Sequence, residues 1–553
     1  MGLVRKGMVL VLKQHFKYIY IMKNKSLKYT IVLAFSILMM NSCETTQMGL
    51  VDDPNSLSPS QANADYFLNS IQVDFAYFVH YMGLTAGEFT RIDQLSSRTY
   101  SQSYSPSSFD YEYTLAYQAI GEDVRLMRPL ADEAGLSFHV GITQVFQAYM
   151  YIAMVDFFDA IPYADALQAA EGVLNPSPTS GEAIYDAAIG LLDSAIANFA
   201  NADAPAPAVD FYYGGNKSKW IKAANSIKKK IYLNLGDTGS YNGVSDYIKN
   251  SADDFQFNWG TALVPANSRH PFYNSCYTST GAQRYTSNWL MHVMLNAYGG
   301  ISDPRIRYYF YRQVPAAPGY GAPPEEQTLE CSLYLAPPHY QATDEPFCAL
   351  VAGYWGRDHG NDAGIPPDPF LRTLYGLYPA GGRYDDKSFE ATLVGQGESG
   401  KGITPIMLSS WIHFMNAEVD SGNKKAHITS GIETSISKVT TFLGYPAPAA
   451  SIIDTYMTQF SDAYDAADTT GKNNILATEY FISMFGNGLD AYNSYRRNGY
   501  PTTIQPNLEP DPGSFPTIMY YPETLTARNQ NFTQRDNLTG RVFWNTNGAT
   551  NLK

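Results

Sequence analysis

The stretch Gly181–Ala200, GEAIYDAAIGLLDSAIANFA, contains the pattern that decides the fold class. Its apolar residues recur at spacings of three and four, which gathers them on one face of an α-helix. These residues are Ile184, Ala188, Leu191, Leu192, Ala195, Ile196 and Phe199. The stretch is therefore predicted to be an amphipathic helix that packs against other helices through this face.

Similar helical patterns lie before and after this stretch. Residues 64–82 and 137–155 are predicted helices, and the second is apolar on almost all sides, as a buried helix is. Two further helices are predicted at residues 406–419 and 474–493. Consecutive helices of this length across short loops predict antiparallel pairs stacked in the tetratricopeptide manner, although the consensus of that repeat is not readable.

One more helix, predicted over Lys217–Leu235, contains a run of three lysines. The residues expected to face inward are Trp220, Ala224, Ile227 and Ile231. Lys228, Lys229 and Lys230 then fall on the remaining surface of the helix. We expect this run to be a solvated helix face and not a binding patch.

Between residues 258 and 402 the sequence changes character. Pro, Gly, Tyr and Asn dominate, and stretches such as PAAPGYG at 315–321 and YPAGG at 378–382 predict loops. A long irregular region in a compact protein is usually functional or disordered, and the many aromatic residues argue against disorder. The predicted fold is mainly α, a helix-pair scaffold with a loop-rich irregular lobe over about 258–402. Loops on a rigid scaffold are common places for binding sites.

The N-terminal region has the parts of a secretory signal. A basic stretch starts at Met22, an apolar run covers residues 29–40, and Asn41-Ser42-Cys43 follows. The apolar run is shorter than the roughly 20 residues that span a bilayer. A cysteine directly after the cleavage point can be lipidated, so Cys43 is the predicted anchor; the alternative is an ordinary secreted protein with a chance cysteine.

These features predict the organisation of the chain. Residues 1–42 are an upstream extension plus a lipoprotein signal peptide, with the true start at Met22. Residues 43–60 form a polar, turn-rich lipidated tether, and residues 61–553 form one domain.

The charge of the chain excludes one class of function. The net charge is −14, and removing residues 1–42, which hold seven Lys or Arg and no acid, leaves about −21. Nucleic-acid binding needs a basic face, so no nucleic-acid partner is expected.

The remaining cysteines are Cys276, Cys331 and Cys348. An odd number cannot pair completely, and a Cys331–Cys348 bridge is plausible in an oxidising compartment. No cysteine or histidine cluster has the spacing of a structural zinc site. The oxygen-rich segment 357–362 could hold Ca²⁺, but it lacks the loop pattern of an EF-hand, so an internal hydrogen-bonded loop is the favoured interpretation and no metal is expected.

Several motifs occur together in a fixed order. They are DFFDAIPYADA at 156–166, YGGN at 213–216 with KWIKAANS at 219–226, DPR at 303–305, SWIHFMNAE at 410–418, FGNG at 485–488 with YRRNGYP at 495–501, and YPE at 521–523 with NQN at 529–531. In this order they resemble the SusD/RagB-like family, the nutrient-binding outer-membrane lipoproteins of Bacteroidota. Tyr495 and Asn498 depart from the Trp and Thr that are common there, and the three lysines replace an Arg-rich run.

The resemblance implies a SusD-like fold and a function. It implies a cell-surface lipoprotein, anchored in the outer membrane through Cys43, that binds an oligosaccharide and delivers it to a SusC-like TonB-dependent transporter. Two alternatives remain: the same uptake role with a peptide ligand, or a surface adhesive or structural protein without a small ligand.

The resemblance also implies that the chain is not an enzyme and needs no cofactor. The sequence has no GxSxG, HExxH or GxxxxGK[ST] motif. Asp156 and Asp159 could be an acid pair, but we interpret them as residues that cap and turn the chain before Pro162.

Glycan binding needs flat aromatic rings and polar groups that reach sugar hydroxyls. Tyrosine suits this role, since it is an apolar plate with a polar tip, and the chain has 43 of them. In the family such residues come from the loop after the first scaffold helices and from the irregular lobe. The corresponding positions here are Arg91, Tyr100, Tyr104 and Tyr111 in the first loop, and Tyr273, Tyr277, Trp289, Tyr354, Trp355 and Arg357 in the lobe. For each aromatic residue a structural role is at least as plausible.

Overall fold

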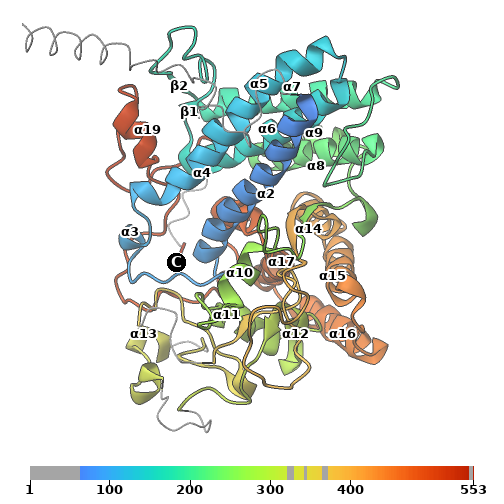
Figure 1. Cartoon of the computed structure of the whole chain (residues 1–553). Helices are drawn as coiled ribbons and strands as arrows, with labels where there is room; N and C mark the ends of the chain where they lie inside the picture. The colour runs from blue at the N-terminus through green and yellow to red at the C-terminus, as the bar shows by residue number, and fades with distance from the viewer. Residues whose placement is uncertain (1–62, 320–328, 342–344, 364–370, 547–551) are drawn as a thin grey trace, which may run out of the picture. The chain divides into compact units, whose positions relative to one another are not determined.

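The computed structural model describes residues 63–319, 329–341, 345–363, 371–546 and 552–553. The predicted signal peptide, the tether and Cys43 lie outside these residues. The described part is mainly helical, as predicted, with three two-stranded antiparallel sheets (Figure 1).

Stacked helices form one part of the molecule (Figure 1). They are α2 (Ala64–Phe89), α5 (Glu122–Glu133), α6 (Ser137–Phe158), α7 (Gly181–Ala200) and α8 (Lys217–Leu235). Helix α2 packs on α5 and α6, α6 packs on α7, and α7 packs on α8. Helix α6 is buried on nearly all sides, which confirms its predicted place in the core. By length and composition α7 could cross a membrane, but its apolar face packs on α6 and α8, so it is a scaffold helix.

The bounds of α7 and α8 agree with the prediction because both helices are capped. The side chain of Ser180 accepts a hydrogen bond from the backbone N–H of Ala183, and Asn216 accepts one from Lys219. Helix α8 ends at Gly236, whose φ of 70° is the left-handed conformation that glycine adopts without strain.

Four predicted helices have wrong bounds, and one of them is α6, which ends at Phe158 and not at residue 155. Helix α2 runs seven residues beyond residue 82, to Phe89. Helix α14 (Ser409–Val419) starts later than residue 406, because Ile403–Met407 form strand β6, which pairs with β3 (Phe255–Asn258). The helix predicted at 474–493 is two helices, α17 (Thr469–Ser483) and α18 (Leu489–Asn498), and Gly486, with a φ of 107°, lies in the break between them.

The lysine run on α8 is another correction, because two of its three members are buried. The ammonium group of Lys229 donates to the carbonyl oxygen of Tyr241 at 3.0 Å and lies 3.5 Å from the centre of its ring. Lys230 forms an ion pair of 2.5 Å with Asp490. Periodicity alone missed these partners, which come from distant segments and allow the charges to be buried.

The remaining elements complete the described part. Around the first loop are α3 (Tyr100–Ser103), η2 (Pro106–Phe109), α4 (Asp110–Thr114) and the π-helical η3 (Leu115–Gly121). The others, in chain order, are β1 (Ile161–Pro162), β2 (Pro178–Thr179), α9 (Thr238–Gly243), η4 (Ser251–Asp253), α10 (Pro271–Cys276), α11 (Asn288–Leu295), η5 (Tyr298–Gly300), α12 (Ile306–Tyr309), β4 (Phe310–Tyr311), η6 (Glu330–Leu333), α13 (Pro338–Gln341), η7 (Val351–Gly353), β5 (Leu374–Tyr375), α15 (Lys424–Thr440), η8 (Phe442–Gly444), α16 (Ala450–Ala466) and α19 (Glu523–Arg528).

Two local predictions for residues 329–363 are confirmed. Cys331 and Cys348 form a disulfide, and Cys276 is a free, buried cysteine. The oxygen-rich segment is an internal hydrogen-bonded loop: the carboxylate of Asp358 accepts from the side chain of Asn288 at 3.0 Å and from the backbone N–H of Cys348 at 2.7 Å.

Candidate functional site

A polar pocket of about 190 Å³ lies at the C-terminal end of α2, where that helix contacts α10. Three segments that are far apart in the sequence form it: the end of α2 with the following loop, residues 283–285, and residues 357–361. The lining residues are Glu88, Gln94, Ser96, Gln283, Arg284, Tyr285, Arg357 and Asn361. Most of these side chains can donate or accept hydrogen bonds, so the pocket can hold a polar ligand group.

An ion pair between Glu88 and Arg284 forms one side of the pocket. A guanidinium nitrogen of Arg284 lies 3.1 Å from one carboxylate oxygen of Glu88, and the hydroxyl of Tyr104 donates to the other. Burial raises the pKa of Glu88, against the effects of both partners. Burial disfavours the charge of Arg284, but Tyr375, Glu88 and Asp93 together raise its pKa. The pair is therefore a fixed, charge-matched part of the wall.

A second acid lies behind this pair. Asp93 is buried, and one of its carboxylate oxygens accepts from the hydroxyl of Tyr375 while the other has no hydrogen-bond partner within the described chain. Burial raises the pKa of Asp93 to about 7, although Tyr375 and Arg284 oppose this shift. The charge beneath the pocket therefore changes near neutral pH.

The opposite wall is made by Arg357 and Tyr285. The guanidinium of Arg357 donates to the hydroxyl of Tyr285 at 2.9 Å and lies 4.2 Å from the centre of its ring. The side chain of Gln94 donates to the carbonyl oxygen of Asn361 at 3.3 Å, which joins the loop after α2 to this wall.

Aromatic rings lie next to the polar pocket along α2. Tyr77 and Tyr81 are one helical turn apart and stack at 6.4 Å, and the ring of Tyr111 from α4 meets Tyr81 edge-on at 5.1 Å. Tyr111 is 50 % exposed. Burial raises the pKa of Tyr81, Glu112 raises it further and Arg284 lowers it. We call Tyr77, Tyr81 and Tyr111 the aromatic strip.

Comparison with known proteins agrees with this architecture. The SusD-like family model, described as "starch-binding associating with outer membrane", matches residues 54–328 and 376–522. The chain belongs to the SusD-like family. No curated protein matches the sequence.

Solved structures of SusD homologues have the same fold. A SusD homologue from Bacteroides fragilis is 18 % identical, with a TM-score of 0.59 over 88 % of this chain and 99 % of its own. A SusD/RagB family protein from Bacteroides thetaiotaomicron is 17 % identical, with a TM-score of 0.62 over 88 % and 99 %. A chitin-binding SusD homologue from Flavobacterium johnsoniae is 15 % identical, with a TM-score of 0.57 over 87 % and 97 %.

The SusD-like motifs make contacts that hold the scaffold together. In the DPR motif, Arg305 pairs with Asp303 at 2.5 Å and with Glu479 at 2.7 Å, and all three side chains are buried. Arg497 of the YRRNGYP motif pairs with Glu418 of the SWIHFMNAE motif at 3.0 Å. None of these five residues lines the polar pocket. These motifs therefore identify the fold and leave the ligand open.

The predicted pair Asp156 and Asp159 is also structural. Asp159 caps the end of α6 with a φ of 59° and accepts from the backbone N–H of Phe543 at 2.7 Å, so it does turn the chain. Asp156 is no cap: it is buried and accepts from the side chains of Tyr185, Trp544 and Asn493.

Three of the ten predicted ligand residues lie at or beside the polar pocket. Arg357 lines it, Tyr104 binds the Glu88 carboxylate, and Tyr111 belongs to the aromatic strip. Arg357 is half-buried and Tyr104 is buried, so of the two tyrosines only Tyr111 offers an open ring.

The other seven are buried, and a buried ring cannot stack on a sugar in this conformation. They are Arg91, Tyr100, Tyr273, Tyr277, Trp289, Tyr354 and Trp355. Their polar atoms have internal partners: Arg91 donates to the carbonyl oxygen of Phe89 at 2.7 Å, and Tyr277 donates to that of Tyr375 at 2.9 Å. In this structure these seven side chains are buried inside the protein.

Sequence reasoning missed most of the pocket. Glu88, Gln94, Arg284 and Asn361 were not predicted because they are not aromatic, and Tyr285 was not predicted because nothing in the sequence separates it from the many other tyrosines of the lobe. A usable signal was present: Glu88 and Asp93 are acidic residues around the end of a long apolar helix, where buried charge requires a partner.

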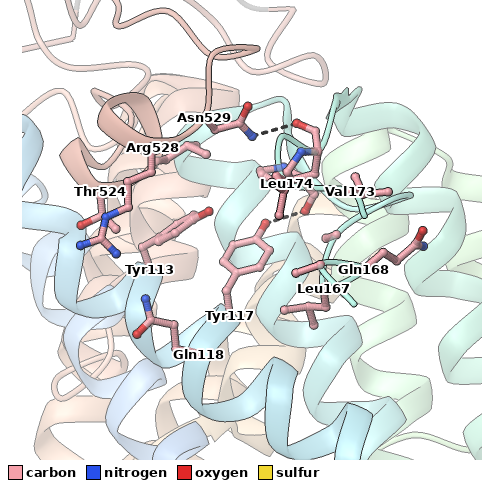
Figure 2. A pocket seen from close by; sticks show the side chains of 15 residues that line it. Tyr113, Tyr117, Gln118, Leu167, Gln168, Val173, Leu174, Thr524, Arg528 and Asn529 are labelled. Atoms are coloured by element: carbon pink, nitrogen blue, oxygen red, sulfur yellow. Dashed lines mark hydrogen bonds between the residues drawn. The ribbon is translucent and has the colours of Figure 1, made fainter. Parts of the chain in front are cut away.

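A second cavity, of about 440 Å³, lies between η3, the loop after β1 and α19. Figure 2 shows the rings of Tyr113 and Tyr117 at this cavity, with Leu167 and Leu174 opposite and Arg528 at its edge. The hydroxyl of Tyr117 donates to the carbonyl oxygen of Pro162 at 2.6 Å, so that ring is fixed. Much of the lining of this second cavity is apolar, and it contains fewer charged groups than the polar pocket. The polar pocket is therefore the stronger candidate for a sugar site.

Proposed function

We propose that this SusD-like protein binds oligosaccharides at the cell surface, in the polar pocket and across the aromatic strip, and delivers them to a SusC-like TonB-dependent transporter. The observation that carries the proposal is that one helix, α2, contributes both to a pocket rich in hydrogen-bonding side chains, through Glu88, and to the aromatic strip, through Tyr77 and Tyr81.

The arrangement suits the two surfaces of a sugar. The C–H faces of a pyranose ring pack on aromatic rings, and its hydroxyls need donors and acceptors at the edge. The exposed ring of Tyr111 offers the first, and Gln94, Gln283 and Asn361 offer the second. Family membership supports the same role, since the family is described as starch-binding and one solved relative as chitin-binding.

We further propose that Cys43 is the lipidated residue, that residues 43–60 are the tether and residues 61–553 the SusD-like domain, and that the protein lies in the outer membrane facing outward. The lipobox-like sequence before Cys43 and the family description "associating with outer membrane" support this location. The ligand would be bound and passed on unchanged, so no catalytic step is assigned.

The test is calorimetric titration of the purified protein with a panel of neutral and acidic oligosaccharides and with peptides of similar size. We expect heat of binding from at least one oligosaccharide class. If only peptides bind, the proposed ligand class is wrong and the ligand is a peptide, but the proposed role in uptake is not contradicted. If neither class binds, an adhesive or structural role is favoured, and co-purification of a SusC-like barrel from extracted membranes then decides between uptake and adhesion.

A further inference from the structure

We propose that the polar pocket selects a sugar with an anionic substituent, a carboxylate or a sulfate, and that Arg357 binds that substituent. This inference rests on the proposed function, because it names the class of sugar for the same site.

The first step is the charge balance of the pocket. Its lining contains one acid, Glu88, and two guanidinium groups, Arg284 and Arg357. Glu88 is engaged on both oxygens, by Arg284 and by the hydroxyl of Tyr104. Within the described residues no carboxylate lies within ion-pair distance of Arg357. The buried Asp358 next to it interacts with it electrostatically, but Asp358 does not line the pocket, so the lining itself contains two guanidinium groups and one acid.

The second step is the geometry of Arg357. Its side chain donates one hydrogen bond, to the hydroxyl of Tyr285, and lies over that ring, which fixes the orientation of the guanidinium. The remaining N–H groups of this guanidinium have no acceptor in the described chain. Arginine presents its donors in a planar fork that matches the oxygens of a carboxylate or sulfate.

A second guanidinium lies on the same tyrosine ring as that of Arg357. Arg372 also lies over the ring of Tyr285, 3.9 Å from its centre. Burial above all, and Arg357 in part, lower the pKa of Arg372 to about 10. Two cations around one ring repel each other, and an anion held by Arg357 would reduce that repulsion.

The size of the pocket agrees with a selective subsite. The pocket, at about 190 Å³, is smaller than the roughly 300–1,000 Å³ of common ligand pockets, so it fits one sugar residue or one substituent. The rest of an oligosaccharide would lie across the aromatic strip. Arg357 and Asn361 belong to residues 329–375, which lie between the two stretches that the SusD-like family model matches, so the match itself assigns no ligand to this wall.

The test compares each charged sugar with a neutral counterpart on the same skeleton. Trigalacturonate is paired with its methyl ester, and a sulfated galactose oligosaccharide with its desulfated form. Calorimetry is done with the wild-type protein, with Arg357→Gln, and with Arg128→Gln as the control. Arg128 is an exposed arginine on α5 that pairs with Asp132 and does not line the polar pocket, so this control removes the same charge outside the proposed site.

We expect at least one charged sugar to bind about tenfold or more tightly than its neutral counterpart, the size expected of a hydrogen bond to a charged group. In Arg357→Gln this preference should shrink to about twofold or less, while the affinity for the neutral sugar should stay unchanged. Arg128→Gln should bind both sugars as the wild type does. The arm that shows the preference distinguishes carboxylate from sulfate, and the preference should weaken at high salt.

Two results overturn the inference. Equal binding of charged and neutral partners would reject it and leave the proposed function intact. A preference that survives in Arg357→Gln would show that another group binds the anion. If no oligosaccharide of either kind binds, the proposed function fails as well. Far-ultraviolet circular dichroism of Arg357→Gln separates lost selectivity from lost folding.

Discussion

Asp156 and Trp544 are 388 residues apart, yet the indole N–H of Trp544 donates to a carboxylate oxygen of Asp156 at 2.9 Å. The same carboxylate accepts from the side chain of Asn493 at 2.7 Å and from the hydroxyl of Tyr185. This contact attaches the C-terminal segment to the last turn of α6, which contains Asp156, and to the start of α7, which contains Tyr185. The first acid of the DFFDAIPYADA motif is thus a buried tertiary anchor.

Replacing this anchor should destabilise the fold without touching the ligand site. In Asp156→Asn one carboxylate oxygen becomes an NH₂ group that faces hydrogen-bond donors. We expect the free energy of unfolding to fall by about 1–3 kcal/mol, measured by urea denaturation. Asp132→Asn on the exposed face of α5 is the control and should change stability by less than about 1 kcal/mol. Equal effects of the two variants would contradict the assigned role.

The DPR ion pairs should contribute more than any surface pair. Arg305→Met leaves Asp303 and Glu479 buried without their cation, and we expect a loss of about 3–5 kcal/mol. Lys425→Met breaks an exposed pair with Asp465 and should cost about 0–1 kcal/mol. Thermal unfolding of both variants measures the contrast, and a tolerated Arg305→Met would show that the motif is not needed for stability.

A glycine that precedes a helix, Gly488 before α18, and a glycine inside a helix, Gly190 in α7, give opposite predictions for the same change. A Cβ on Gly488 would lie 2.4 Å from the Cα of Gly87 in α2, so Gly488→Ala must separate two backbones and should destabilise by about 1–3 kcal/mol. Gly190 lies exposed in α7 with nothing within 4 Å of its Cβ position. Gly190→Ala should stabilise by about 0.5–1 kcal/mol, because alanine loses less entropy in a helix. Chemical denaturation of both tests the close approach of Gly488 to α2.

The aromatic strip should contribute to sugar binding through Tyr111. Tyr111→Ala removes the most exposed ring of the strip, and we expect affinity for an oligosaccharide to fall roughly 2- to 12-fold. Tyr66→Ala is the control, since Tyr66 is also 50 % exposed but lies at the other end of α2. Calorimetry should show no change in that control. Unchanged affinity in Tyr111→Ala would remove the strip from the site.

The buried acid beneath the pocket should make stability depend on pH. The pKa of Asp93 rises from 3.8 to about 7 on burial, so the folded state holds the proton more tightly than the unfolded state. The contribution of Asp93 to the free energy of unfolding should therefore be largest below about pH 4, and it should decrease as the pH rises towards 7. Asp93→Asn removes the titration, and urea denaturation between pH 4 and pH 8 should show a shallower fall.

A matched change shows whether this slope belongs to Asp93. Asp465→Asn, at an exposed carboxylate, should leave the slope as in the wild type. If Asp93→Asn and the wild type lose stability in parallel, the proton is held elsewhere. Glu112 is the next candidate, because burial raises its pKa to about 7 as well.

The sequence by itself determined the scaffold. Periodic apolar residues and the capping side chains of Ser180 and Asn216 set α7 and α8 to the residue, because caps and periodicity act between neighbours within a few positions. The ordered motifs were enough to predict the family. The long helix predicted at 474–493 failed where Gly486 breaks it, since a glycine alone does not reveal whether a helix ends.

Only the tertiary structure decided which side chains form the pocket. Tyrosine is stable both in the core and at the surface, so the sequence could not separate the buried Tyr277 from the exposed Tyr111. The outcome depends on whether a distant carbonyl oxygen meets the hydroxyl, as that of Tyr375 meets Tyr277. Likewise, Glu88 and Arg284 are 196 residues apart, and only folding pairs them and brings Arg357 into the same pocket lining.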